Sequence, residues 1–70
     1  METINLFRKP GMESDVVHER VQRFFQDRDY TISRLYDEHA KYNVVIGGDG
    51  TFLRAVHSTS FSSIPFLGIN

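Results

Sequence analysis

The stretch Val44-Val45-Ile46-Gly47-Gly48-Asp49-Gly50-Thr51-Phe52-Leu53 decides the fold of this chain. Its three leading β-branched apolar residues predict a short buried strand. A glycine-rich turn follows, and residues 51–58 have helical spacing, with Thr51 as the expected helix cap. Such a turn directs backbone N–H groups and a helix N-terminus at one point, which favours binding of an anion, phosphate above all.

Asp49 in the middle of this turn indicates chemistry beyond phosphate binding. A fixed negative charge repels phosphate unless the carboxylate has a task, such as taking a proton from a hydroxyl or holding a metal ion. Gly47, Gly48 and Gly50 allow the backbone to approach phosphates, because no Cβ intervenes. Thr51 adds a hydroxyl at the same place. The turn therefore predicts phosphoryl transfer.

The rest of the chain alternates strand-like and helix-like segments. Residues 14–28 carry an apolar stripe at helical spacing, formed by Val17, Val21, Phe24 and Phe25. Ser14 is the expected N-cap of this helix, and His18 falls on its polar side. We expect strands at residues 3–7, 30–36, 44–46 and 65–69, and helices at 14–28 and 51–58. The resulting β-α-β-β-α-β order predicts an α/β fold with a doubly wound, mostly parallel sheet.

Ligands of such sheets gather at the carboxyl ends of the strands, where the strand order reverses. The glycine turn leaves the third strand there, and the Arg8-Lys9-Pro10-Gly11 turn leaves the first strand at the same edge if the two are parallel. Arg8 and Lys9 are thus candidates to face a phosphate, although a solvated loop is the simpler interpretation. Asp37, Glu38 and His39 also predict a solvated loop, because consecutive side chains diverge. No metal ligand is predicted.

Composition narrows the classes of function. The chain has 70 residues, a formal net charge of -1 and no cysteine. It therefore lacks the basic field of a nucleic-acid-binding protein, and it has no apolar run near the roughly 20 residues of a membrane span. We expect a cytoplasmic protein. Residues 1–70 are expected to form a single N-terminal α/β domain that is truncated, because the sequence stops on a strand.

Three general interpretations of the glycine turn remain to be compared. A Walker-type phosphate loop requires a lysine after its last glycine, and Thr51 stands there instead. A dinucleotide fingerprint requires a third glycine where this chain has Leu53. A plain tight turn explains a Gly-Gly pair, but Gly-Gly-Asp-Gly-Thr directly after three β-branched residues is more specific than that.

Residues 47–51 resemble the signature shared by NAD kinases, phosphofructokinases and diacylglycerol or sphingosine kinases. The flanking Phe52-Leu53-Arg54-Ala55 and Pro65-Phe66-Leu67-Gly68-Ile69-Asn70 resemble NAD kinase. Diacylglycerol kinases resemble the chain less, because their helix after the motif usually carries Asn-Glu. The resemblance is specific over residues 44–70 and covers residues 1–43 only in the order of elements.

The resemblance implies an activity. NAD kinase transfers the γ-phosphoryl group of ATP, or of inorganic polyphosphate in some members, to the 2′-hydroxyl of the adenosine ribose of NAD, giving NADP. The family requires a divalent cation such as Mg²⁺ and forms homodimers or homotetramers. Its active site lies between an N-terminal α/β domain and a C-terminal β-rich domain, so this chain alone is expected to be inactive.

The resemblance also implies residue roles. Asp49 matches the motif aspartate that is proposed to take the 2′-hydroxyl proton. Asp49 and Gly50 match positions that touch NAD, and Arg54 matches a basic position near the dinucleotide. Two other interpretations stay open: a nucleotide-binding module without catalysis, and a fragment of a lipid kinase related to diacylglycerol kinase.

Overall fold

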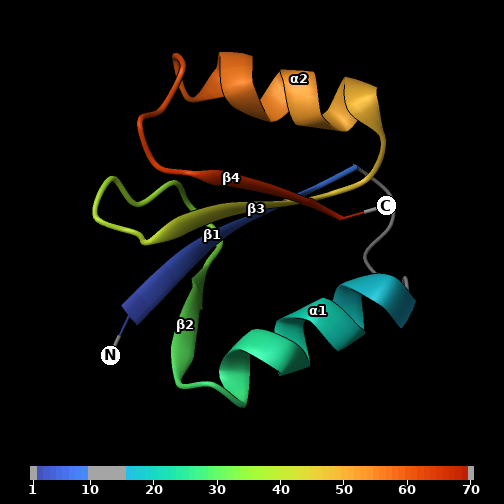
Figure 1. Cartoon of the computed structure of the whole chain (residues 1–70), viewed down its shortest axis with the longest axis vertical. Helices are drawn as coiled ribbons and strands as arrows, with labels where there is room; N and C mark the ends of the chain where they lie inside the picture. The colour runs from blue at the N-terminus through green and yellow to red at the C-terminus, as the bar shows by residue number, and fades with distance from the viewer. Residues whose placement is uncertain (1, 10–15, 70) are drawn as a thin grey trace.

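The computed structural model of the chain describes residues 2–9 and 16–69. Its elements follow the predicted order: β1 (Glu2–Arg8), α1 (Val16–Gln26), β2 (Tyr30–Ser33), β3 (Tyr42–Ile46), α2 (Asp49–Ser58) and β4 (Phe66–Ile69). All strand pairs are parallel and the order across the sheet is β2-β1-β3-β4. The two helices cover opposite faces of the sheet (Figure 1). The predicted α/β fold with a parallel sheet is confirmed.

The sheet divides its side chains between the two helices. Because successive residues of a strand point to opposite faces, Ile4, Val44 and Ile46 form the core with the α1 residues Val21 and Phe25. The opposite face, under α2, contains the fully buried Val45 and the buried Ala55 of α2. The three-residue apolar run in β3 is thus explained by burial on both faces.

The chain leaves β1 and β3 towards different faces. β1 leads to α1 on one face, and β3 leads to α2 on the other (Figure 1). Since β1 and β3 are neighbours in the sheet, their carboxyl ends mark the point where the strand order reverses. Arg8 pairs with Ile46 in the register, so Arg8 lies beside the start of the glycine turn.

The connection from β2 to β3 contains no helix. The strand predicted over residues 30–36 is shorter in the structure, where β2 covers Tyr30–Ser33. β2 ends at Ser33, and the Ser33 hydroxyl donates to the carbonyl of Leu35, two residues on. Leu35 is 84% exposed, so it has no burial to hold it in a strand. Residues 34–41 then pass β1 and enter β3 on its other side.

Asn5, in the middle of β1, holds this connection. The Asp37 N–H donates to Asn5 Oδ1 at 2.7 Å, and Asn5 Nδ2 donates to the Asp37 carbonyl at 3.0 Å. Asn5 Nδ2 also donates to Asn43 Oδ1 on β3 at 2.9 Å. Both asparagines are essentially fully buried. The Asn5 amide thus satisfies the N–H and the carbonyl of Asp37, in a connection that has no helix to pair its backbone groups internally.

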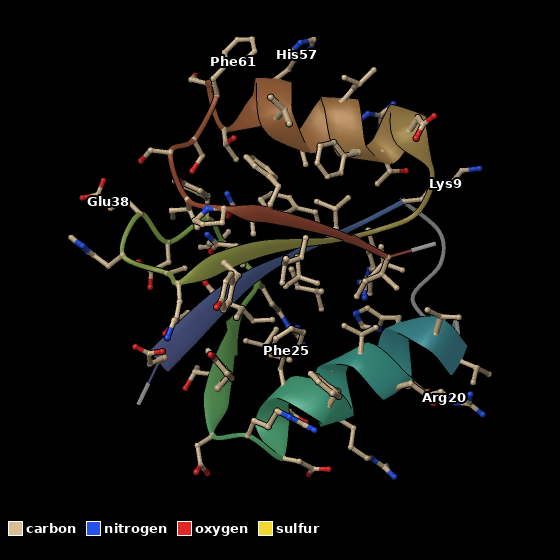
Figure 2. The ribbon with its side chains drawn as sticks, viewed as in Figure 1. Lys9, Arg20, Phe25, Glu38, His57 and Phe61 are labelled. Carbon is tan, nitrogen blue, oxygen red and sulfur yellow. The ribbon has the colours of Figure 1, made fainter. Side chains whose placement is uncertain are left out.

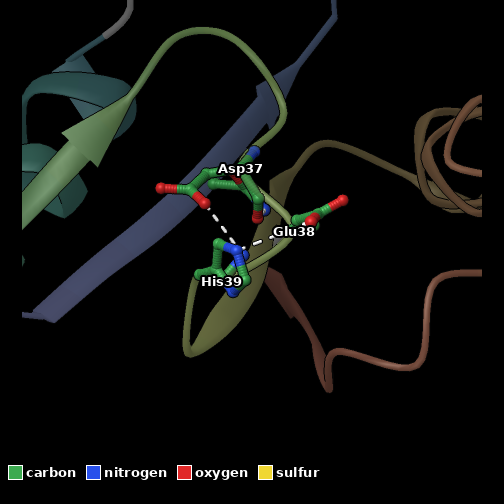
Figure 3. A network of polar contacts seen from close by, with 4 residues as sticks. Asp37, Glu38 and His39 are labelled. Atoms are coloured by element: carbon green, nitrogen blue, oxygen red, sulfur yellow. Dashed lines mark hydrogen bonds and ion pairs between the residues drawn. The ribbon is translucent and has the colours of Figure 1, made fainter.

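Asp37, Glu38 and His39 form a polar loop, as predicted (Figure 3). The His39 N–H donates to Asp37 Oδ1 at 2.8 Å, and His39 Nε2 lies 3.5 Å from Glu38 Oε1. The Glu38 and His39 side chains are largely exposed. Across residues 2–9 and 16–69, no three His, Cys, Asp or Glu residues cluster as metal ligands.

Helix α1 is rotated relative to the predicted stripe. His18, Val21 and Phe25 are its buried residues, whereas Val17 is 39% and Phe24 is 49% exposed. The prediction that His18 is a surface residue is therefore wrong. The physical reason is that the stripe at spacing i, i+3 and i+7 faces the sheet, and residue 18 completes it. Ser14, the predicted cap, lies outside the described residues.

Both helices are short. In the described part of the chain, neither has the length and apolarity that a bilayer-spanning helix needs.

Candidate anion-binding site at the carboxyl ends of β1 and β3

The glycine turn begins with a backbone conformation that only glycine adopts readily. Gly47 has φ of +142°, and its N–H donates to the Ile69 carbonyl of β4 at 2.9 Å. A Cβ at this position would lie 2.8 Å from Thr51 Oγ1. Gly47 therefore permits both the turn and the close approach of Thr51.

Helix α2 begins earlier than predicted. Its N-cap is Gly48, with no side-chain hydrogen bond, and its first residue is Asp49. The expectation that Thr51 caps the helix is wrong, because Thr51 lies inside the first turn and packs over Gly47. Asp49 in this turn interacts favourably with the positive end of the helix dipole. The first backbone N–H groups of α2 have no partner within the helix and point out beyond its start.

A hollow of about 560 Å³ lies at this helix start. It is lined by Gly48, Gly50, Thr51 and Arg54 from the turn and α2, together with Arg8 and Lys9 from the end of β1. The space beside the α-carbons of Gly48 and Gly50 is open, with no atom within 4 Å of a Cβ built there. The fold leaves these two glycines accessible to a ligand.

Four of the six predicted site residues line the hollow, and Gly47 and Asp49 do not. The four are Gly48, Gly50, Thr51 and Arg54. Gly47 lies one residue before them and shapes the turn. Asp49 stands between Gly48 and Gly50 with an exposed side chain, so it lies next to the hollow without lining it.

The hollow is positively charged. Arg8, Lys9 and Arg54 line it, and none of the three forms an ion pair with a carboxylate among residues 2–9 and 16–69. Figure 2 shows Lys9 beside the first turn of α2. Together with the helix N-terminus, these cations favour an anion with several negative charges. Sequence reasoning preferred a solvated loop for Arg8 and Lys9; in the structure Arg8 ends β1, Lys9 is exposed, and both line this hollow.

A second hollow, of about 640 Å³, lies under α1 at the ends of β1 and β2. Leu6 and Ile32 form its apolar wall, and Gln22, Ser33 and Arg34 supply polar groups. Arg8 lines this hollow too, so its side chain stands at the boundary between the two.

His18 of α1 contacts Arg8 at this boundary. Arg8 Nη1 lies 2.8 Å from His18 Nε2, and His18 is 9% exposed. Sequence reasoning missed this pair because residues 8 and 18 belong to different elements. The one available signal was the i, i+3, i+7 spacing of His18 with Val21 and Phe25.

The chain is similar in sequence to known proteins. The family description that matches the chain is "ATP-NAD kinase N-terminal domain", over residues 3–70. A protein named NAD kinase from Finegoldia magna is 66% identical over 35 residues, covering 50% of this chain and 13% of the relative. A protein of the same name from Lachnospira eligens is 32% identical over 66 residues, covering 94% of this chain and 22% of the relative.

The chain is much shorter than these relatives. A further protein named NAD kinase, from Porphyromonas gingivalis, is 54% identical over 33 residues, and the match spans 12% of its length. No solved structure matches the chain significantly.

Proposed function

The chain belongs to the ATP-NAD kinase family, whose N-terminal domain it matches over residues 3–70, and from this premise we propose that the full-length protein phosphorylates NAD. The reaction transfers the γ-phosphoryl group of ATP, or a terminal phosphoryl group of inorganic polyphosphate, to the 2′-hydroxyl of the adenosine ribose, giving NADP. The observation that carries the proposal is the glycine turn with Asp49 beside a cationic hollow at the start of α2.

In the proposed reaction Asp49 is the base. Its exposed carboxylate accepts the proton of the ribose 2′-hydroxyl as the hydroxyl oxygen attacks the terminal phosphorus of the donor. The bond from that phosphorus to the bridging oxygen breaks, and ADP or the shortened polyphosphate leaves. Phosphoryl transfer depends mainly on positioning and electrostatic stabilisation, which N–H groups at a helix start and nearby cations supply.

In the proposal, Asp49 and the residues around it also bind the substrates. Asp49, Gly50 and Arg54 contact NAD, and the turn residues Gly47, Gly48, Gly50 and Thr51 receive phosphate groups. The space beside Gly48 and Gly50 is open for them. Arg54 lies on α2, one turn after Gly50, and lines the hollow. The Arg54 guanidinium would therefore neutralise part of the negative charge of a pyrophosphate bound in the hollow.

A divalent cation, Mg²⁺ above all, completes the proposal as a companion of the phosphoryl donor. Mg²⁺ keeps several waters and is held by one or two carboxylates plus substrate phosphates, so it needs no cage of protein ligands. This chemistry fits the described residues, among which Asp49 is the carboxylate next to the hollow and no three-ligand cluster occurs. When bound, the ion would neutralise charge on the phosphates.

The proposal extends to the protein's assembly and location. We expect a β-rich domain to close the site, self-association into a homodimer or homotetramer, and action in the cytoplasm. The absence of cysteine fits a reducing compartment. The family match and the names of the relatives favour NAD kinase over a lipid kinase related to diacylglycerol kinase.

The test uses the full-length protein with NAD, Mg²⁺ and either ATP or polyphosphate, and measures NADP formation. Asp49→Asn keeps the side-chain shape and removes the proton acceptor, so kcat should fall by about 10²–10⁴-fold while NAD affinity changes little. A kcat within about threefold of the parent would remove Asp49 from the mechanism. Binding of NAD without any turnover in the parent would instead favour a non-catalytic nucleotide-binding module.

A further inference from the structure

The proposed function assigns no particular substrate to the cations at the end of β1. Arg8 and Lys9 precede the connection to α1, and both line the hollow at the start of α2. They come from a different strand than the glycine turn, and the parallel pairing of β1 with β3 brings them there. Within residues 2–9 and 16–69 these cations have no carboxylate partner, and their gathering at one hollow from two elements indicates an anionic ligand.

The charge of the site indicates which phosphates these cations bind. Asp49 adds a negative charge beside the hollow, so a highly charged phosphate chain needs more than one compensating cation. The phosphate chain of ATP or of polyphosphate carries more negative charge than the pyrophosphate of NAD. Arg54 follows Asp49 on α2, whereas Arg8 and Lys9 approach from β1. The β1 cations are thus suited to the donor.

His18 determines where the Arg8 guanidinium lies. Arg8 Nη1 lies 2.8 Å from His18 Nε2 and 3.4 Å from His18 Nδ1, and because a guanidinium can only donate, the imidazole nitrogen that bonds it is the acceptor. His18 is buried on the face of α1 that packs against the sheet, and its backbone is part of the helix. This contact restrains Arg8 at the boundary between the two hollows.

We propose that Arg8 and Lys9 bind the phosphate chain of the phosphoryl donor, and that His18 is a positioning residue for Arg8. The identity of the ligand in this assignment rests on the proposed NAD kinase function. The choice of residues rests on the geometry of β1, α1 and α2. The assignment separates the two substrates of the reaction: cations of β1 serve the donor, and Arg54 of α2 serves the dinucleotide.

The test compares Michaelis constants in the full-length protein. Arg8→Gln and Lys9→Ala should each raise KM for ATP and for tripolyphosphate about five- to tenfold, because each removes a charge-assisted contact. KM for NAD should stay within about twofold, since these side chains do not serve the dinucleotide. An effect on ATP and tripolyphosphate alike identifies the phosphate chain, rather than the nucleoside, as the bound group.

Two matched variants control for loss of charge alone. Arg20→Ala removes an exposed arginine on α1 that projects away from the sheet in Figure 2. Lys41→Ala removes a lysine just before β3 that pairs with Glu2 at 3.0 Å, at the amino ends of the strands. Neither should alter KM for the donor. Equal effects of the controls and of Arg8→Gln would overturn the proposal.

The role of His18 has its own test. His18→Gln retains a hydrogen-bond acceptor and should preserve the donor KM, whereas His18→Leu keeps a buried apolar volume without an acceptor and should match Arg8→Gln. The two variants are compared only after thermal unfolding shows that both fold. If Leu and Gln have the same donor KM, His18 does not position Arg8.

Direct binding separates failure of this assignment from failure of the proposed function. Titration of tripolyphosphate with Mg²⁺ into the full-length protein needs no turnover. If the parent forms no NADP but Arg8→Gln and Lys9→Ala still weaken tripolyphosphate binding, the proposed function fails and the phosphate-binding assignment of Arg8 and Lys9 holds. If both variants bind tripolyphosphate like the parent, or if KM for NAD rises as much as KM for the donor, the assignment is refuted.

Discussion

Alanine at two glycines of the turn, Gly47 and Gly50, should change the stability of the protein in opposite directions. At Gly50, within the first turn of α2, an added Cβ meets no atom within 4 Å. Because alanine is the better helix former, Gly50→Ala should stabilise the protein by about 0.5–1 kcal/mol. The same methyl group enters the hollow that Gly50 lines, so phosphate should bind about 10–100-fold more weakly.

At Gly47 the added Cβ would clash with the Thr51 side chain and strain the backbone. The φ of +142° is accessible to glycine almost alone, and forcing alanine into such a region costs about 1–3 kcal/mol. The Cβ would also lie 2.8 Å from Thr51 Oγ1, so the side chain or the turn must shift. Gly47→Ala should therefore destabilise the protein by on the order of 3 kcal/mol.

The assay measures urea unfolding of both full-length variants and titrates each with tripolyphosphate. Gly50→Ala is expected to unfold at a higher urea concentration than the parent while binding more weakly. Gly47→Ala is expected to unfold at a lower one. A Gly50→Ala protein that binds phosphate like the parent would show that the hollow is not the phosphate site. A Gly47→Ala protein as stable as the parent would refute the account of the turn.

Three further outcomes follow from the same geometry. Arg54→Ala in the full-length enzyme should raise KM for NAD about tenfold with a smaller change in kcat, and an unchanged KM at low salt would make Arg54 a plain surface residue. Asn5→Ala should lower the free energy of unfolding by on the order of 3 kcal/mol, because two backbone groups of Asp37 and the Asn43 amide lose a buried partner. Ser63→Ala, at an exposed position, is its control and should change that free energy by less than about 0.5 kcal/mol. Equal effects of the two variants would contradict the role of Asn5 in holding the β2–β3 connection. The 70-residue chain by itself should form no NADP, and turnover above a no-enzyme control would contradict this.

The glycine stretch could be interpreted from sequence because its information is local. Three β-branched residues, a glycine turn and a helical segment specify a strand, a turn and a helix at consecutive positions. The exact start of α2 could not be predicted. Thr51 is the better cap by residue type, but the cap is Gly48, and Thr51 is held in the first turn over Gly47.

The β2–β3 connection was beyond local reasoning. Asn5 and Asn43 are polar residues that look like interruptions of apolar strands, yet both are buried. Their amides pair with each other and with Asp37, which lies 32 residues from Asn5 in the sequence. A sequence pattern shows that a residue is polar, but it does not show which distant backbone group satisfies that residue.

The sequence by itself determined the order of strands and helices and the glycine turn with Asp49, since hydrophobic period and glycine chemistry act between near neighbours. Only the tertiary structure decided that β1 lies beside β3. That pairing brings Arg8 and Lys9 to the same hollow as Gly48, Gly50 and Arg54. It also lets the buried His18 contact Arg8. The physical reason is that the charged side chains of such a site come from separate strands and helices. The pairing of the strands determines which of these side chains lie close together.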